Sequence, residues 1–400
     1  MIDRSQAIRD IVSQYGPIDP KLITDPTTLP LAVPSFGQAE IIEAVDALLS
    51  GWLTMGERVF EFERRWAEYI GTSQAIAVNS GSSALLVMLS AMIECGYLNR
   101  GQEVIVPAVG WSTSLFSVAQ AGLTPVLVDV DPDTLSLSGQ FEEPVLAIHM
   151  LGNPARVQTP WLLEDSCGAH GAELAGKKTG SIGHCGAFSF FFSHHITTGE
   201  GGAITTNDSQ LADACRSIRA HGWVRERTDR STWEANHPQI DPRFLFASMG
   251  YNLRMTEMSG AIGMHQVDRI EGFVRQRRQN HQHWCEMVDA LSLPLRVYPE
   301  APNTRHAGFA FPMMLDEDAP ITRAQLCTEL ENRQIQTRPI SGANLAIQPA
   351  FEKVPNKKIR GPLPVATAVQ ERGFFVGQSH CFTDAHGELL CGALKEIFAS

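Results

Sequence analysis

Three short segments of the sequence carry polar residues that could do chemistry, and the first is suited to binding an anion. At 79–89 the apolar run AIAV leads into Asn-Ser-Gly-Ser-Ser and then into a helical pattern, ALLVML. Small residues at the start of a helix let backbone N–H groups point at an anion, and the helix dipole favours negative charge there. Gly81 and Ser82 are therefore candidate phosphate ligands. A serine at this position is also a common N-cap, so the segment alone leaves both interpretations open.

The second segment, LLEDSCGAHGAEL at 162–174, places a carboxylate directly after an apolar strand pattern. Ligands of α/β sheets bind at the carboxyl ends of strands, which makes Asp165 a candidate site residue. A carboxylate at such a position can pair with a protonated ring nitrogen of a bound molecule. The alternative is an aspartate that only caps a following helix.

The third segment, FSFFFSHHITTGEGGAITTND at 188–208, resembles the sugar aminotransferase and dehydratase family of fold-type I pyridoxal-phosphate enzymes. In the aminotransferases of this family a lysine precedes TTGEGG by a fixed interval and binds the cofactor covalently. His194 occupies that position here, and this exchange marks the sugar 3-dehydratase branch. Imidazole can move a proton near neutral pH. The resemblance therefore implies a catalytic His194 and non-covalent pyridoxal or pyridoxamine phosphate, whereas His195 matches no role.

The resemblance extends over nearly the whole chain and implies further cofactor contacts. Asp165 matches the partner of the protonated pyridine nitrogen, a contact that makes the ring a better electron sink. Trp111, in VPAVGWSTS, falls where the family stacks an aromatic ring on the cofactor. Ser189 matches a phosphate-binding serine. Asn252, in MGYNLRMTEMSGAIG, matches an asparagine that reaches the phosphate from the neighbouring subunit, which implies a homodimer with shared active sites.

Two other positions bear on the sugar and on the cofactor's surroundings. The segment RAHGW at 219–223 also matches the dehydratases and implies that His221 lies near the sugar substrate. Gly168 departs from the family, whose members usually carry Gln or Glu three residues after the ring-nitrogen aspartate. The polar contact is therefore either missing here or supplied by another residue, for which His170 is a candidate.

Two dehydratase subtypes share the histidine. The subtype that acts on CDP-4-keto-6-deoxyglucose holds an iron–sulfur cluster through cysteines in the loop after HGW, and residues 224–247 contain no cysteine. The resemblance therefore favours the subtype that acts on GDP-4-keto-6-deoxymannose, in colitose-type deoxysugar and lipopolysaccharide O-antigen biosynthesis. It implies a nucleotide-sugar substrate, L-glutamate as amino donor, release of ammonia and no iron–sulfur cluster. The sequence itself leaves the nucleotide open.

Other functions remain possible at this level of evidence. An ordinary sugar aminotransferase would need a substitute lysine, and Lys177 and Lys178 lie nearby in AGKKTG, which we expect to be an exposed turn. A catalytically silent homologue would also tolerate loss of the lysine. It would have no need to keep Trp111, Asp165, Ser189 and Asn252 together.

The elements that must position these residues follow from the apolar pattern. Short runs such as EVIVP, PVLVDVD and VLAIHML alternate with helical segments, which predicts a mainly parallel sheet covered on both faces. We expect an N-terminal segment at 1–35, a large α/β domain at 36–265 and a smaller α+β domain at 266–400. The resemblance implies the aspartate aminotransferase-like fold for the large domain. The polar stretch 220–247 is long for a loop, so we expect it to be functional or disordered.

Net charge, apolar content and cysteine spacing bear on the partners and the cellular location of the protein. The 400 residues carry a net charge of −12, which argues against a nucleic-acid partner. No apolar run is long enough to span a membrane, and the N-terminus lacks the pattern of a signal peptide. The eight cysteines form no close cluster, so we expect reduced thiols and no metal site in a cytoplasmic protein.

Overall fold

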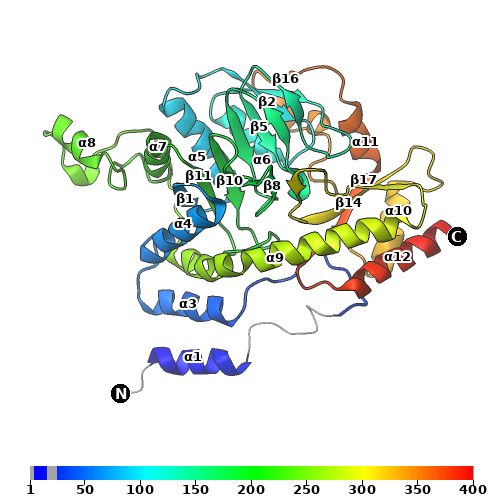
Figure 1. Cartoon of the computed structure of the whole chain (residues 1–400). Coiled ribbons are helices and arrows are strands. Elements are labelled where there is room, and N and C mark those ends of the chain that lie inside the picture. Colours follow the sequence, from blue (N-terminus) through cyan, green and yellow to red (C-terminus); the bar gives the residue numbers. More distant parts are fainter. Residues whose placement is uncertain (1–3, 16–24, 400) are drawn as a thin grey trace.

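The computed structural model describes residues 4–15 and 25–399, and an eight-stranded mixed sheet forms its centre (Figure 1). The strand order is β1–β11–β10–β7–β5–β2–β3–β16. β11 runs antiparallel to both of its neighbours, and the other pairs are parallel. The strands are β1 (Gln74–Val78), β2 (Glu103–Pro107), β3 (Thr124–Val128), β5 (Val145–Ile148), β7 (Leu162–Asp165), β10 (Cys185–Ser189), β11 (Gly202–Thr206) and β16 (Lys358–Ile359). The prediction of a mainly parallel sheet is confirmed.

Helices cover both faces of this sheet, because alternate residues of each strand pack in opposite directions. In β1, Ile76 and Val78 join the core beneath one set of helices, and Ala77 joins the core on the other face. The first set is α5 (Gly81–Glu94), α6 (Ser112–Gln120) and α7 (Ser209–Arg219); the second is α4 (Glu57–Ile70) and α9 (Glu257–Asp289). Burial on two faces explains why the strands appear in the sequence as continuous apolar runs.

A second, four-stranded antiparallel sheet forms the smaller α+β unit that the sequence predicts. Its order is β12–β14–β17–β15, with β12 (Leu295–Val297), β14 (Ala310–Leu315), β15 (Thr337–Pro339) and β17 (Gly373–Gly377). The accompanying helices are α10 (Arg323–Asn332), α11 (Pro364–Arg372) and α12 (Asp384–Ala399). The boundary predicted between residues 265 and 266 falls inside α9, so that division of the chain stays a prediction.

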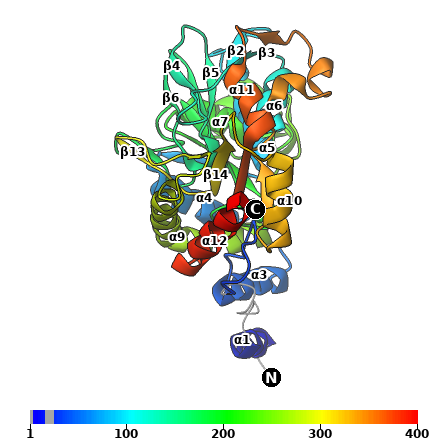
Figure 2. The ribbon, with the colours of Figure 1, turned by 90° about the vertical axis from the view of Figure 1, so that its right-hand side faces the viewer.

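The N-terminal helices lie outside both sheets. α1 (Arg4–Tyr15) packs on α3 (Gln38–Leu49), which in turn packs on α9 (Figure 2). None of the helices in the described ranges is long and apolar enough to cross a membrane. The remaining short elements are β4 (Ser138–Gln140), β6 (Arg156–Gln158), β8 (Glu173–Leu174), β9 (Lys177–Lys178), β13 (Thr304–Arg305), η1 (Met150–Gly152), η2 (Pro242–Phe244), η3 (Leu345–Ile347) and η4 (Phe351–Lys353).

Residues 224–249, called the arm below, project from the body at the left of Figure 1. The arm contains the short helix α8 (Arg230–Asn236), which has no buried residue. Phe244, Phe246 and Met249 expose half or more of their surface along it. This long polar stretch therefore has secondary structure of its own, the helix α8 and the short 3-10 helix η2 (Pro242–Phe244).

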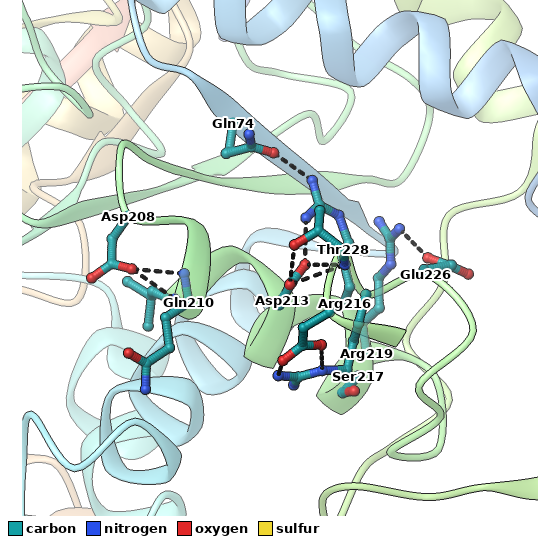
Figure 3. A network of polar contacts seen from close by, with 12 residues as sticks. Gln74, Asp208, Gln210, Asp213, Arg216, Ser217, Arg219, Glu226 and Thr228 are labelled. Atoms are coloured by element: carbon teal, nitrogen blue, oxygen red, sulfur yellow. Dashed lines mark hydrogen bonds and ion pairs between the residues drawn. The ribbon is translucent and has the colours of Figure 1, made fainter. Parts of the chain in front are cut away.

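Buried ion pairs fasten the base of the arm to the body. Arg219, at the end of α7, is fully buried and pairs with Glu63 of α4. It also pairs with Glu226 of the arm, at 2.6 Å (Figure 3). Arg219 Nη1 also donates a hydrogen bond to the carbonyl oxygen of Ala77 in β1. These contacts join a helix, a strand and the arm at one point.

Candidate active site

A cavity of about 710 Å³ lies at the carboxyl ends of β1, β5, β7 and β10, between the two sheets. This is the edge at which α/β proteins bind ligands. Six of the predicted site residues line it: Gly81, Ser82, Trp111, Asp165, Ser189 and His194. Asn252 and His221 do not line it. The structure thus brings together residues spread over more than a hundred positions of the chain.

The first turn of α5 and the end of β10 form one wall of the cavity. Ser80 is the N-cap, and its Oγ accepts a hydrogen bond from the backbone N–H of Ser83. The N–H groups of Gly81 and Ser82 have no partner within the helix, as is general for a first turn. A Cβ at Gly81 would lie only 2.6 Å from Ser189 Cβ, so the close approach of helix and strand requires glycine. The result is a cradle for an anion such as a phosphate.

Asp165 supplies a buried negative charge to the same cavity. Its exposed fraction is 5%, and its Oδ2 accepts a hydrogen bond of 2.6 Å from Ser114 Oγ. Oδ1 accepts another from the backbone N–H of Cys167. Within the ranges that the structure describes, no lysine, arginine or histidine forms an ion pair with Asp165. A buried carboxylate held only by neutral donors can pair with a cationic ring nitrogen of a ligand.

Trp111 offers a flat apolar surface in the cavity. It stands at the N-cap of α6, and 61% of its surface is exposed although it lines the cavity. A large aromatic ring left uncovered in a concave site is suited to stacking on a planar ligand.

His194 lies on the loop between β10 and β11, with its ring against Phe309 in an edge-on contact at 5.1 Å. Its backbone N–H donates to the carbonyl oxygen of Phe191, and its Nδ1 is buried without a hydrogen-bond partner. Burial lowers the pKa of His194 to about 4, and the positive charge of Arg277 on α9 adds to this effect. The imidazole is therefore neutral at pH 7 and able to accept a proton.

Two further histidines lie behind His194. His195 is fully buried, and its Nε2 lies 3.0 Å from the carbonyl oxygen of Ala307, a position that fits the absence of a catalytic match. His170 is also fully buried, and neither ring nitrogen has a hydrogen-bond partner. Because His170 does not line the cavity, it does not supply the polar contact that Gly168 lacks. A Cβ at Gly168 would make only ordinary contacts, the nearest at 3.8 Å.

His221 and Asn252 lie next to each other but outside this chain's cavity. Residues 220 and 252 form a β-bridge, and the backbone N–H of His221 donates to the carbonyl oxygen of Tyr251 at 2.6 Å. The Asn252 side chain is exposed and accepts a hydrogen bond from Arg254 Nε. The expected roles of both residues, Asn252 at the phosphate of a neighbouring subunit and His221 near the sugar, stay predictions.

The cavity also contains residues that the sequence did not single out. Ser114 contacts Asp165 directly, and Cys167, Glu200, Phe309 and Arg338 are part of the lining or its support. Ser114 carried no signal of its own, because its partner Asp165 lies 51 residues further along the chain. Arg338 on β15 carried no signal, because a lone arginine in a strand pattern is usually solvated.

Comparisons with known proteins agree with this geometry. The chain is 36% identical over 374 residues to a GDP-4-keto-6-deoxy-D-mannose 3-dehydratase of Yersinia pseudotuberculosis, covering 87% of this chain and 93% of the relative. It is 32% identical over 336 residues to a GDP-perosamine synthase of Caulobacter vibrioides, covering 80% and 85%. A solved structure of E. coli GDP-4-keto-6-deoxy-D-mannose-3-dehydratase with bound hydrated PLP matches with a TM-score of 0.85 and 31% identity, covering 92% of this chain and 99% of that one.

The family assignment rests on a match over most of the chain. The sequence profile of the DegT/DnrJ/EryC1/StrS aminotransferase family covers residues 35–395, which include every predicted site residue. The fold, with a mainly parallel mixed sheet and a smaller α+β unit, is that of the relatives of known structure. This chain therefore belongs to the DegT/DnrJ/EryC1/StrS aminotransferase family.

Proposed function

We propose that this protein is a pyridoxamine phosphate-dependent 3-dehydratase. Its substrate would be a nucleotide-linked 4-keto-6-deoxy sugar, GDP-4-keto-6-deoxymannose in the first instance, with L-glutamate as amino donor. One observation carries the proposal: a neutral imidazole, His194, lines the cavity at the position where the aminotransferases carry lysine. The names of the Yersinia and E. coli relatives support the same reaction and the same nucleotide.

The residues of the cavity fit the phosphate and the ring of vitamin B6. Gly81, Ser82 and Ser189 would hold the phosphate, and Trp111 would stack on the ring. Asp165 would pair with the ring nitrogen and keep it protonated. When bound, pyridoxamine phosphate supplies the amine that attaches to the sugar ketone and the two electrons that replace the lost hydroxyl.

A second subunit would complete the site. We infer a homodimer in which Asn252 reaches the phosphate of the neighbouring subunit, because its side chain is exposed and lies away from its own cavity. The exposed Phe244, Phe246 and Met249 of the arm, which ends three residues before Asn252, support an interface there. The reaction would take place in the cytoplasm, as the sequence predicts.

His194 would move the protons. Because Nδ1 is sealed in the protein, Nε2 is the nitrogen left to take a proton from the C4′ carbon of the cofactor. Burial makes the protonated imidazole more acidic than an imidazolium in water. It can therefore pass that proton to the departing C3 hydroxyl, which leaves as water. The overall reaction would convert the sugar and glutamate into a 4-keto-3,6-dideoxy sugar, 2-oxoglutarate and ammonia.

The test is an assay of the purified protein with pyridoxamine phosphate, glutamate and GDP-, CDP- or dTDP-linked 4-keto-6-deoxy sugars. We expect one equivalent each of ammonia and 2-oxoglutarate per deoxygenated sugar, with the GDP sugar preferred. His194→Asn is the matched control, since it keeps a polar side chain without a titratable nitrogen. An amino sugar formed without ammonia would instead identify an aminotransferase and refute the proposal.

The aminotransferase alternative has a weak structural basis. The relative from Caulobacter vibrioides is named a GDP-perosamine synthase, and such an enzyme would need a lysine here. Lys177 is exposed, and Lys178 places its Nζ 4.6 Å from the centre of the Tyr69 ring. Neither lysine lines the cavity. Borohydride reduction followed by peptide mass spectrometry would detect a cofactor adduct on either of them.

A further inference from the structure

Arg277, on α9 behind the cavity, is a buried cation without an anionic partner. Its exposed fraction is 3%, and its Nη1 donates only to main-chain carbonyl oxygens, those of Gly308 and Phe309 at 3.3 Å and that of Gln378. Its Nε is buried without a partner, and no carboxylate in residues 4–15 or 25–399 forms an ion pair with it. Burial lowers the pKa of Arg277 to about 10, so the group is still charged at neutral pH.

The carbonyl partners of Arg277 connect it to the proposed base. Gly308 and Phe309 belong to a segment that forms one wall of the cavity, and the Phe309 ring packs edge-on against His194. The preceding residue of the segment, Ala307, accepts the hydrogen bond from His195 Nε2. Arg277 therefore holds the backbone that fixes both histidines from behind.

Two other histidines lie close to His194 within the protein. His170 lies 6.0 Å from His194 and 5.1 Å from His195 between ring centres, and burial lowers the pKa of all three. The other titratable groups that line the cavity are His149 after β5, Asp165 from β7, Cys167 after β7, Glu200 from the loop of His194 itself and Arg338 from β15. Arg277 is already charged at a pH where the histidines are neutral, so it repels the positive charge that protonation of His194 would add to this wall.

We propose that Arg277 is a positioning residue for His194: its hydrogen bonds to the carbonyl oxygens of Gly308 and Phe309 hold the wall against which the imidazole packs, and its uncompensated charge adds to the effect of burial by disfavouring the protonated imidazole. The inference rests on the proposed function only in taking His194 as the base. A buried cation without a counter-ion is otherwise costly, and its action on a proton-accepting histidine on the far side of the same wall gives the charge a role.

The test is a titration of His194 by ¹⁵N NMR in the intact protein loaded with pyridoxamine phosphate, which needs no sugar substrate. The signal is assigned by its loss in His194→Asn. Removal of the positive charge in Arg277→Met should raise the titration midpoint by at least about 0.5 pH unit, because the protonated imidazole is no longer repelled. Arg277→Gln is a second neutral variant that keeps hydrogen-bond donors, should the first not fold.

Two variants separate charge from packing. Arg277→Lys keeps the charge and should keep the midpoint of the wild type, while Arg275→Met on the exposed side of α9 should leave it unchanged. Equal midpoints in the wild type and both neutral variants would overturn the inference, as would a shift in Arg277→Lys equal to that in Arg277→Met. A shift seen without any dehydratase activity would uphold the role of Arg277 while refuting the proposed reaction, so the two failures are distinguishable.

Discussion

Replacement of Arg219 by methionine tests whether the buried ion pairs at the base of the arm stabilise the fold. Arg219 is fully buried and pairs with Glu63 and Glu226, and it also donates to the carbonyl oxygen of Ala77. In Arg219→Met the Glu63 carboxylate would stay buried with the backbone N–H of Ala77 as its remaining donor. A buried charge that loses its counter-ion is the costly case, because neither water nor an opposite charge replaces the lost partner.

The magnitude follows from burial and chain length. Removal of one partner from a buried pair costs roughly 3–5 kcal/mol in the free energy of unfolding. With an unfolding entropy of about 2.1 cal/mol/K per residue, 400 residues give about 0.8 kcal/mol/K, so the melting temperature should fall by about 4–6 °C. Arg216→Met, one turn earlier on α7, removes the pair with Asp213, but that carboxylate keeps the N–H and hydroxyl donors of Thr228, so the variant should lose less stability than Arg219→Met (Figure 3).

Calorimetry of the single variants and of Glu63→Gln with Arg219→Met checks this reasoning. We expect the double variant to lose less stability than the two single variants together, because removing Glu63 as well leaves only the partly exposed Glu226 without its partner. Strict additivity, or a loss in Arg219→Met no larger than in Arg216→Met, would show that the pair carries no buried-charge penalty.

Four other outcomes are expected at the cavity. Gly81→Ala should weaken pyridoxamine phosphate binding at least about tenfold in an absorbance titration, because its Cβ would meet Ser189 at 2.6 Å. Asp165→Asn should lower cofactor affinity and leave the melting temperature of the cofactor-free protein nearly unchanged. Trp111→Ala should weaken binding by roughly tenfold, and Trp111→Phe should restore most of it. Since burial lowers the pKa of His194 to about 4, stability should fall between pH 6.5 and 4, and less so in His194→Asn.

Much of the fold was predictable because each strand buries both faces and therefore leaves an uninterrupted apolar run. The direction of each strand was not predictable. β11 runs antiparallel to β10 because the loop at 190–201 turns the chain back beside β10. β16 was missed for a different reason. Its two residues, Lys358 and Ile359, are exposed and carry no apolar pattern, and the strand exists only because β3 offers an open edge.

The predicted site residues were recognisable where they stand at the ends of elements. Gly81 begins a helix, and Asp165 and Ser189 end strands, so local pattern and position pointed to them. Ser114 and Arg277 could not be predicted as site residues, because each acts on a partner more than thirty residues away in the chain. Ser114 donates to Asp165, and Arg277 donates to the carbonyl oxygen of Phe309. The role of Gly168 was also a matter of tertiary structure, since the room beside it depends on Phe309 and Leu151.

The course of α9 limits how this chain can be divided for expression or exchange of parts. At about 1.5 Å per residue its 33 residues make a rod of about 50 Å, which passes from beneath the large sheet to the small one. A cut at residue 265 would create two new helix ends, each with four backbone groups lacking partners. The cut would also separate Gly260 and Gly263 from the rest of α9. These two glycines allow α4 to pack closely against that helix. Chimeras between relatives should therefore exchange α9 whole.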